Sequence, residues 1–332
     1  MATERQFTNS LARFFGSPRG VRIGIGDDAA VVGNRAGESV VCCDPVVAGV
    51  HFTADDPPEL VGRKVVNRNL SDLAAMGARA DWLLVSLVLP RGYPARARAA
   101  LLRGIRAAAR AGRAAVVGGD VATSPGPLVV TVTAIGHLPG RALVRSGARA
   151  GDTIHVTGPL GGSRAGHHLR FRPALAEGVW LARQPAVHAA MDVSDGLLLD
   201  LATLLAASGG LGAELDLRAL PVRRAALDLA RGDRERALQH ALHDGEDHVL
   251  LWTQAAAARL ATGGPVAAAR RRPIGRVLAE PGLWLVDDRG RRRATGRLGF
   301  EHALDAARDR PARGAGRHDE PRRVARRPPP RR

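Results

Sequence analysis

Aspartates recur along this 332-residue chain in short turns rich in glycine and other small residues. They are Asp27 and Asp28 in GIGDDAA, Asp44 in CCDP, Asp72 in NLSDLAAMG, Asp120 in VVGGD, and Asp192 with Asp195 in MDVSDG. Magnesium prefers oxygen ligands, and proteins usually hold it with one or two carboxylates plus substrate phosphates. The pattern therefore predicts a site that gathers several hard cations around a polyphosphate.

Other residues suit the same chemistry. Gly118 and Gly119 allow backbone amides to approach a phosphate, and Arg145 offers a planar guanidinium that can bind phosphate oxygens in pairs. Lys64 is the only lysine and does not belong to a GK[ST] motif, which excludes a Walker-type phosphate loop. We therefore expect phosphoryl transfer that depends on positioning and on electrostatic stabilisation by metal ions and cationic side chains.

Each of these motifs also has a structural interpretation. Short carboxylates often cap helices or shape turns. Asp195 and Gly196 are also suited to cap the helix that follows, a role compatible with metal contact, and Asp27 is suited to shape its own turn. Ser194 has no neighbouring base and is better suited to a nucleotide contact than to nucleophilic attack. The adjacent Cys42 and Cys43 supply two soft ligands, too few for a zinc site.

The elements that must position these residues follow from apolar spacing and from glycine and proline. The pattern predicts a helix from Pro57 and Pro58 to Gly77, with Asn69 and Asp72 on one face. It also predicts a turn at Gly118 to Asp120 and a loop at Met191 to Gly196. Further helices are expected at 94–112, 197–207 and 235–243, and strands at 21–25, 31–32, 39–44, 82–89, 114–117, 128–136, 153–157, 213–217, 248–253, 274–278 and 283–286.

Length and composition indicate two mixed α/β domains and a tail. We expect domains at 1–147 and 148–306, followed by a disordered segment at 307–332 rich in arginine and proline. The tail holds ten arginines against three acidic residues and so inflates the formal charge of +17. Nucleic acid is therefore not expected to bind the folded part, whereas the tail is either a nucleic-acid or membrane contact or an inert extension.

No apolar run reaches the ~20 residues needed to span a membrane, and no secretion signal is evident. With only two cysteines, which are adjacent, a disulfide framework is excluded. A cytoplasmic location is expected.

Eight segments in order resemble the thiamine-monophosphate kinase family, over roughly residues 7–302. They are GIGDDAAVV, DPVVAGVHF, KVVNRNLSDLAAMGA, VVGGD, GRALVRSGARAGD, VTGPLGGS, MDVSDGLLLDL and HDGEDHVLL. The family belongs to a superfamily with aminoimidazole ribonucleotide synthetase and selenophosphate synthetase. The resemblance implies the aminoimidazole ribonucleotide synthetase-like fold, a homodimer formed through the N-terminal domain, and ATP bound at the dimer interface.

The resemblance also implies the site and the reaction. The implied metal ligands, for several Mg²⁺ ions, are Asp28, Cys42, Cys43, Asp44, Asp72, Asp120, Asp192 and Asp195. The implied ATP contacts are Gly119, Asp120, Arg145 and Ser194, and the implied substrate contacts are His51, Glu246 and Phe300. The implied reaction converts thiamine monophosphate and ATP to thiamine diphosphate and ADP by direct in-line transfer.

Two departures and two alternatives accompany this resemblance. The family usually has hydroxyl residues where this chain has Cys42 and Cys43, and thiols are poor ligands for Mg²⁺, so backbone carbonyls would have to serve. The segment from Ser163 to Met191 is shorter than the family pattern. One alternative is another ATP-using enzyme of the superfamily with a different small substrate; the other is a basic binding protein that works through its tail.

Overall fold

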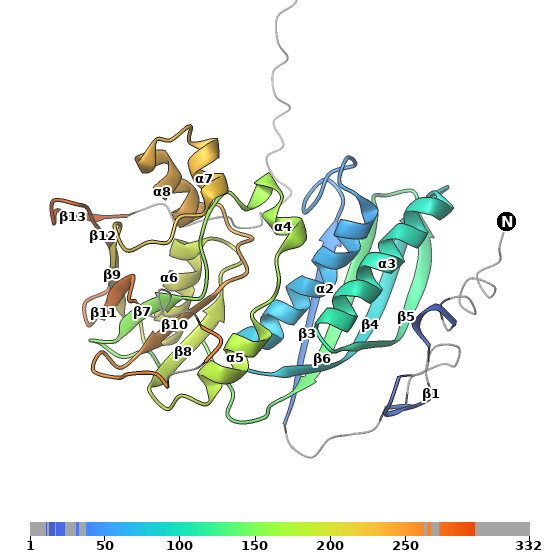
Figure 1. Ribbon diagram of the computed structural model, residues 1–332, viewed down its shortest axis with the longest axis horizontal. Coiled ribbons are helices and arrows are strands. Elements are labelled where there is room, and N and C mark those ends of the chain that lie inside the picture. The colour runs from blue at the N-terminus through green and yellow to red at the C-terminus, as the bar shows by residue number, and fades with distance from the viewer. Residues whose placement is uncertain are drawn as a thin grey trace, which may run out of the picture. The chain divides into compact units, whose positions relative to one another are not determined.

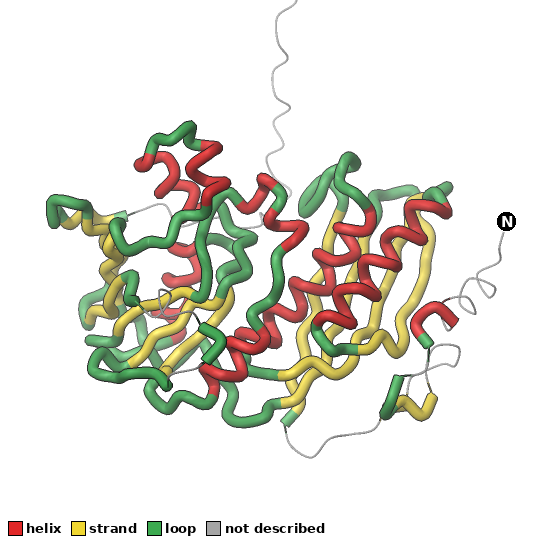
Figure 2. Tube along the Cα trace, viewed as in Figure 1, coloured by secondary structure: helices red, strands yellow, loops and turns green. Residues whose placement is uncertain are grey.

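Two large β-sheets, each with its own helices, and one two-stranded ribbon make up most of the part of the chain that the computed structural model describes (Figures 1 and 2). The described residues are 11, 13–16, 18–23, 31–32, 38–261, 264–266 and 272–295. The predictions for Asp27, Asp28, Phe300 and the tail lie outside them. The expected mixed α/β architecture is confirmed.

The first sheet has four strands and is covered by two helices on one face (Figure 1). Its strands, in spatial order, are β3 (Ser39–Val47), β6 (Val129–His137), β4 (Arg79–Pro90) and β5 (Ala115–Ser124). The first two pairings are antiparallel and β4 with β5 is parallel. Ahead of this sheet lies a two-stranded ribbon of β1 (Val21–Ile23) and β2 (Val31–Val32).

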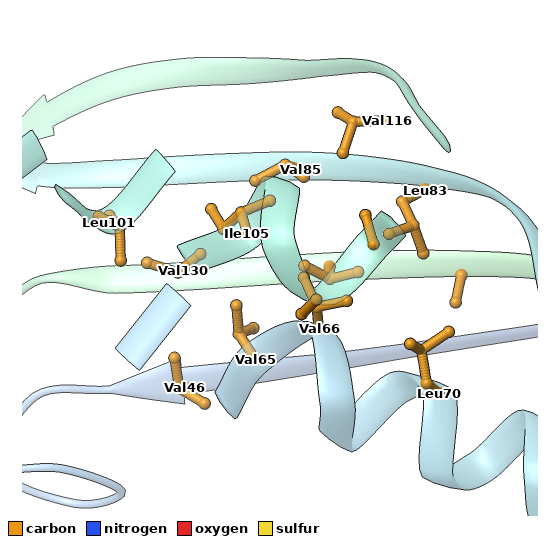
Figure 3. Close-up of a cluster of buried hydrophobic side chains, with 14 of the residues drawn as sticks. Val46, Val65, Val66, Leu70, Leu83, Val85, Leu101, Ile105, Val116 and Val130 are labelled. Carbon is orange, nitrogen blue, oxygen red and sulfur yellow. The ribbon is translucent and has the colours of Figure 1, made fainter. Parts of the chain in front are cut away.

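Helices α2 (Pro58–Ala75) and α3 (Ala95–Ala111) hold the first core (Figure 3). Val65 and Leu70 of α2 and Ile105 of α3 are completely buried between the helices and the sheet. Burying one such side chain stabilises the fold by about 1.5–3 kcal/mol. The same packing fixes α2 against β3, and so fixes the polar residues that α2 carries between its apolar ones.

The boundaries of α2 agree with the prediction. Proline 58 occupies its first turn, where no N–H is needed. At its end the N–H of Ala78 donates to the carbonyl of Leu73, and that of Gly77 to the carbonyl of Ala74. This Schellman motif requires a left-handed residue, and Gly77 supplies it with φ +73°.

Two glycines allow α2 and α3 to cross at close range. A Cβ on Gly62 would lie 2.2 Å from the carbonyl oxygen of Leu101, and one on Gly104 would lie 1.9 Å from that of Glu59. Any side chain at either position would push the helices apart. The close approach of α2 to α3 therefore depends on these two residues.

The second sheet has seven strands, in the order β13-β12-β9-β11-β7-β10-β8. Its strands are β7 (Thr153–Val156), β8 (Val187–Asp192), β9 (Gly212–Asp216), β10 (Leu250–Gln254), β11 (Gly275–Leu278), β12 (Gly282–Val286) and β13 (Arg292–Ala294). The helical segments of this half are η1 (Ser163–Ala165), α4 (His167–Arg170), α5 (Leu175–Ala182), α6 (Leu197–Ala207), α7 (Arg224–Leu229) and α8 (Arg234–His243). None of the helices in the described segments is long and apolar enough to cross a membrane.

A third cluster of buried apolar side chains joins the two sheets. Ala74 at the end of α2 packs with Leu181 of α5 and with Trp252 of β10. On the same helix the Asn67 amide donates to the backbone carbonyl of Phe171 at 2.7 Å. Helix α2 therefore contacts both sheets, and it is the element on which a site between them can be built.

Two sequence predictions about strands were wrong. Gly118 to Asp120 do not form a turn; β5 runs through them to Ser124, with a register irregularity opposite Leu83 and Leu84 on β4. Gly119 has φ +154°, and a Cβ there would lie 1.9 Å from a carbonyl oxygen of β4, which explains why this strand requires glycine. Similarly, Met191 and Asp192 end strand β8 and are not part of the following loop.

Candidate active site

Three of the predicted aspartates come together beside α2. Asp44 is on β3, Asp72 is on α2, and Asp192 ends β8. Ser71 donates its hydroxyl to Asp192 Oδ2 at 2.6 Å, and His248 Nδ1 lies 3.3 Å from the same oxygen. The Ser71 contact joins the end of strand β8 in the second sheet to helix α2 of the first half.

The three carboxylates repel one another. Burial, followed by the charges of Asp192 and Asp44, raises the pKa of Asp72 to about 7. Burial also opposes ionisation of Asp192, but hydrogen bonds from His248 and Ser71 outweigh it and lower the pKa of that carboxyl. Simultaneous ionisation of all three carboxylates is therefore unfavourable without added positive charge.

This group fits a hard cation. Its donors are carboxylate oxygens, the type that Mg²⁺ prefers, and a cation would relieve the repulsion that raises the pKa of Asp72. Among the described residues, no three His, Cys, Asp or Glu side chains enclose a metal position. Since Mg²⁺ usually takes only one or two protein carboxylates and completes its shell with water and phosphate, such an enclosure is not required.

The two cysteines lie on opposite faces of β3, as successive strand residues must. The Cys42 thiol faces α2 and donates to the carbonyl oxygen of Asn69 at 3.3 Å. Burial and then the charges of Asp72 and Asp44 raise its pKa far above the ordinary value, so it remains a neutral thiol. Cys43 is exposed on the other face, where Thr133 donates to its sulfur at 3.3 Å. Their side chains cannot both face one ion; ligation through backbone carbonyls remains a prediction.

Cations of α2 balance the carboxylates from the other side. Arg68 lies 3.3 Å from Asp44 Oδ2 and 3.9 Å from Glu246 Oε1. One turn earlier, the Lys64 ammonium lies 2.6 Å from Glu246 and donates to the carbonyl oxygen of His51, also at 2.6 Å. Glu246 and His51 are two of the predicted substrate contacts, and Lys64 therefore links them.

Ser194, one of the predicted nucleotide contacts, lies on the loop after β8. Asp200 Oδ2 accepts the backbone N–H groups of Ser194, Asp195 and Gly196 at 2.9, 3.0 and 3.2 Å. Asp195 is exposed and does not cap α6; the side chain of Asp200 holds this loop instead, and burial followed by the charges of Asp192 and Asp195 raises its pKa to about 8. Arg145 is exposed and interacts electrostatically with Asp192, which places its guanidinium near the same group.

The turn that carries Glu246 is tied to the glycine-rich GPLGGS loop. Asp247 is buried, pairs with Arg223, and accepts the N–H of Gly161 at 3.0 Å. Ser163 donates to the carbonyl oxygen of Gly245 at 2.6 Å. These contacts fix the backbone of the turn.

Asp120 and Gly119 are not brought to the three aspartates within one chain. Across the first sheet Asp44 pairs with Val132, Val132 with Val85, and Val85 with Gly119. Asp44 and Gly119 are therefore on opposite edge strands, three strand spacings or roughly 14 Å apart. Val85 is buried against the helices, and its register partner Gly119 faces the same side of the sheet. Asp120 follows Gly119 along β5, so it is exposed on the opposite face.

Several residues of this group were not predicted from the sequence as site residues. They are Lys64, Arg68, Ser71, Asp200, Asp247 and His248. One signal was present: Lys64, Arg68 and Asp72 are spaced four apart and so fall along one face of α2. Asp200 contacts backbone groups only four to six residues earlier in the chain. The contacts of Ser71, Asp247 and His248 join segments far apart in the sequence, which spacing along the chain does not reveal.

Comparison with known proteins agrees with this fold and site. Two family models match: "AIR synthase related protein, N-terminal domain" over residues 26–138 and "AIR synthase related protein, C-terminal domain" over residues 155–238. Together they define the class, proteins related to AIR synthase. A thiamine-monophosphate kinase of Rhodopirellula baltica is 40% identical over 276 residues, covering 80% of this chain and 86% of the relative.

Solved structures show the same likeness. The crystal structure of thiamine-monophosphate kinase from Stenotrophomonas maltophilia K279a has a TM-score of 0.71 at 32% identity, covering 86% of this chain and 96% of that chain. AaThiL complexed with AMPPCP and TMP has a TM-score of 0.70 at 26% identity, covering 91% and 99%. The chain belongs to the thiamine-monophosphate kinase family, and it is a kinase.

Proposed function

We propose that this chain uses ATP to phosphorylate thiamine monophosphate, giving thiamine diphosphate and ADP by direct in-line transfer. The observation that carries the proposal is the polar group beside α2, where Asp44, Asp72 and Asp192 lie together with the cation Arg68. Such a group suits the charge of a polyphosphate and its metal ions. The relative solved with AMPPCP and TMP supports the choice of substrates.

In this proposal Asp44, Asp72 and Asp192 hold Mg²⁺, together with the predicted Asp28, Asp120 and Asp195. When bound, Mg²⁺ neutralises the charge that develops on the transferring phosphoryl group. Among the protein's own residues, Arg68 and Arg145 are the proposed guanidinium contacts to phosphate oxygens, supported by their proximity to Asp44 and Asp192. Asp200 fixes the loop of Ser194, which presents its hydroxyl to the nucleotide.

The acceptor is oriented by residues on the other side of α2. His51 accepts the N–H of Val47 on its Nδ1 at 3.1 Å, so its neutral ring carries the proton on Nε2. Although burial alone would raise it, the Lys64 ammonium lowers the pKa of Glu246, which therefore presents an ionised carboxylate. The proposed role of His51 and Glu246 is to position thiamine monophosphate for attack on the γ-phosphate.

We also infer that the working unit is a homodimer. In the described part of the chain no helix covers the face of the first sheet opposite α2 and α3, which we call the open sheet face. Val41, 62% exposed, and Cys43 and Pro45 lie on it, and Asp120 is exposed on the same face. A second copy packed there would cover this apolar surface. Because Asp44 is on the edge strand β3, we infer that the partner's Asp120 reaches the site around that edge.

The direct test follows the product. Purified protein is incubated with ATP, Mg²⁺ and thiamine monophosphate, and thiamine diphosphate is detected by phosphorus NMR, with thiamine as the control acceptor. We expect product from the monophosphate only. No product would defeat the proposal, and ATP consumed with another small acceptor would favour a different enzyme of the same class.

The stereochemistry tests the mechanism. With ATP made chiral at the γ-phosphorus, a single in-line transfer inverts the configuration. Retention would reveal two successive transfers through a phosphorylated enzyme and would contradict the direct step.

A further inference from the structure

Lys64 occupies an unusual position for the only lysine of the chain. Its side chain is fully buried, although lysine is almost never fully buried unless it is paired. The ammonium contacts the carbonyl oxygen of His51 and the carboxylate of Glu246, both at 2.6 Å. Those two residues are separated by 195 positions and belong to the two halves of the molecule.

Burial of the Lys64 ammonium costs desolvation free energy, and packing of the fold does not require a charge at this position. Desolvation lowers the pKa of Lys64, and the Glu246 carboxylate acts in the opposite direction. A methionine of similar length would fill the same space without that cost. The charge is therefore best explained by its contacts with Glu246 and with the backbone of His51.

Glu246, the ion-pair partner of Lys64, is on a strained turn. Glu246 has φ +53°, and His248 has φ +48°, a region that non-glycine residues seldom adopt. Two backbone hydrogen bonds fix the turn itself, from Glu246 N to Ser194 O at 2.7 Å and from His248 N to Val193 O at 2.8 Å. They leave the direction of the Glu246 side chain open. The ion pair with Lys64 fixes that direction.

We propose that Lys64 is a positioning residue: it sets the Glu246 carboxylate and the His51 segment in one fixed geometry for the thiamine phosphate acceptor. This inference rests on the proposed function. Lys64 does not itself touch the substrate, because its side chain has no exposed surface. Arg68 is the other cation near Glu246, but at 3.9 Å and with Asp44 as its closer partner it cannot replace Lys64.

A double-mutant cycle tests the proposal, with the variants Lys64→Met, Glu246→Gln and both together. Steady-state kinetics give kcat and the KM of each substrate, calorimetry gives the affinity for thiamine monophosphate, and thermal melting reports the fold. Arg63→Met, which removes an exposed cation from the neighbouring position of α2, is the matched control.

We expect Lys64→Met to raise the KM for thiamine monophosphate about tenfold or more while the KM for ATP changes by less than about twofold. In the Glu246→Gln background the same substitution should change the acceptor KM by only about twofold, since the group that Lys64 orients is already lost. A merely structural role would lower the melting temperature without this dependence on residue 246.

Three results would overturn the inference. One is an acceptor KM that Lys64→Met leaves unchanged; another is an equal rise in both KM values; the third is the same effect of Lys64→Met in both backgrounds. Should Lys64→Met fail to fold because Glu246 is left unpaired, comparison of the double variant with Glu246→Gln still tests the inference, since a rise of the acceptor KM well above about twofold there would overturn it. A wild-type protein that neither binds nor phosphorylates thiamine monophosphate would overturn the proposed function instead, and this inference with it.

Discussion

His167 is the clearest example of a single residue whose environment, rather than its type, determines its behaviour. Its Nε2 donates to the carbonyl oxygen of Asp247 at 3.1 Å, and its ring lies beside Phe171. Burial, followed by the positive charge of Arg223, lowers the pKa of His167 to about 4. The sequence segment GHHLR alone does not predict this, because the acidic turn that His167 meets lies 80 residues further along the chain.

A pH-dependent loss of stability follows. The folded chain keeps His167 neutral, whereas the unfolded chain binds a proton below its ordinary pKa of 6.5. The unfolded state therefore binds more protons between pH 6.5 and 4, and this residue makes the fold less stable as the pH falls through that window. We expect His167→Gln, which keeps an N–H donor, to lose less stability between pH 7 and pH 5 than the wild type in urea unfolding. Parallel losses in the two proteins would contradict this assignment.

Contacts between distant segments also limit what the sequence predicts about the other charged residues of the site. Asp44, Asp72 and Asp192 were predicted because their short motifs match a family pattern, and the structure brings them together. From the sequence, Lys64 indicates only that a Walker loop is absent. Its pairing with Glu246 could not be predicted, because helical spacing shows which residues share a face but not which loop of the other half covers that face.

At the scale of elements, α2 was predicted almost to the residue, because proline and glycine mark its ends and tertiary packing agrees with local preference. Helix α6 was predicted at 197–207 and is found there. Strand β8 and the short helices α5 and α7 were missed. They are brief and alanine-rich, and for segments of that length apolar periodicity carries little information.

The crossing of α2 and α3 gives an element-scale prediction. We expect Gly104→Ala to destabilise the fold by about 1–3 kcal/mol, because the new methyl group would meet the carbonyl oxygen of Glu59 at 1.9 Å. The better helix propensity of alanine offsets only about 1 kcal/mol of this. Urea unfolding midpoints provide the measurement. Gly140→Ala, where no atom lies within 4 Å of the added Cβ, is the control, and equal midpoints for the two variants would refute the close-crossing argument.

At the scale of the whole molecule, one chain separates residues that the reaction is expected to use together. Asp44 faces α2 from one edge strand, and Asp120 is exposed on the open sheet face from the opposite edge. Sequence motifs in order along the chain cannot reveal this separation, since they carry no information about which strands become edges. The domain boundary near residue 148 and the cytoplasmic location remain predictions.

Mixing two inactive variants tests whether a site is shared between copies. Asp44→Asn and Asp120→Asn should each abolish turnover as homodimers while remaining folded. If Asp120 serves the partner's site, random re-pairing makes half of the dimers mixed, each with one intact site, and restores about a quarter of the wild-type rate. Mixtures that stay inactive, despite exchange of subunits shown by mass spectrometry, would place both aspartates in the same chain's site.

The apolar cluster that joins the sheets has a consequence for synthesis of the protein. During synthesis Ala74 on α2 is made before its packing partners Leu181 and Trp252, and Ser71 is made 121 residues before its partner Asp192. At about 5–20 residues per second, a ribosome needs roughly 5–20 s to supply the missing partners after it has completed the first sheet. During that interval the apolar surface at the end of α2 would be exposed in a newly made first half. Chains released early, or slowed by scarce codons between residues 150 and 250, should therefore be the ones that chaperones capture.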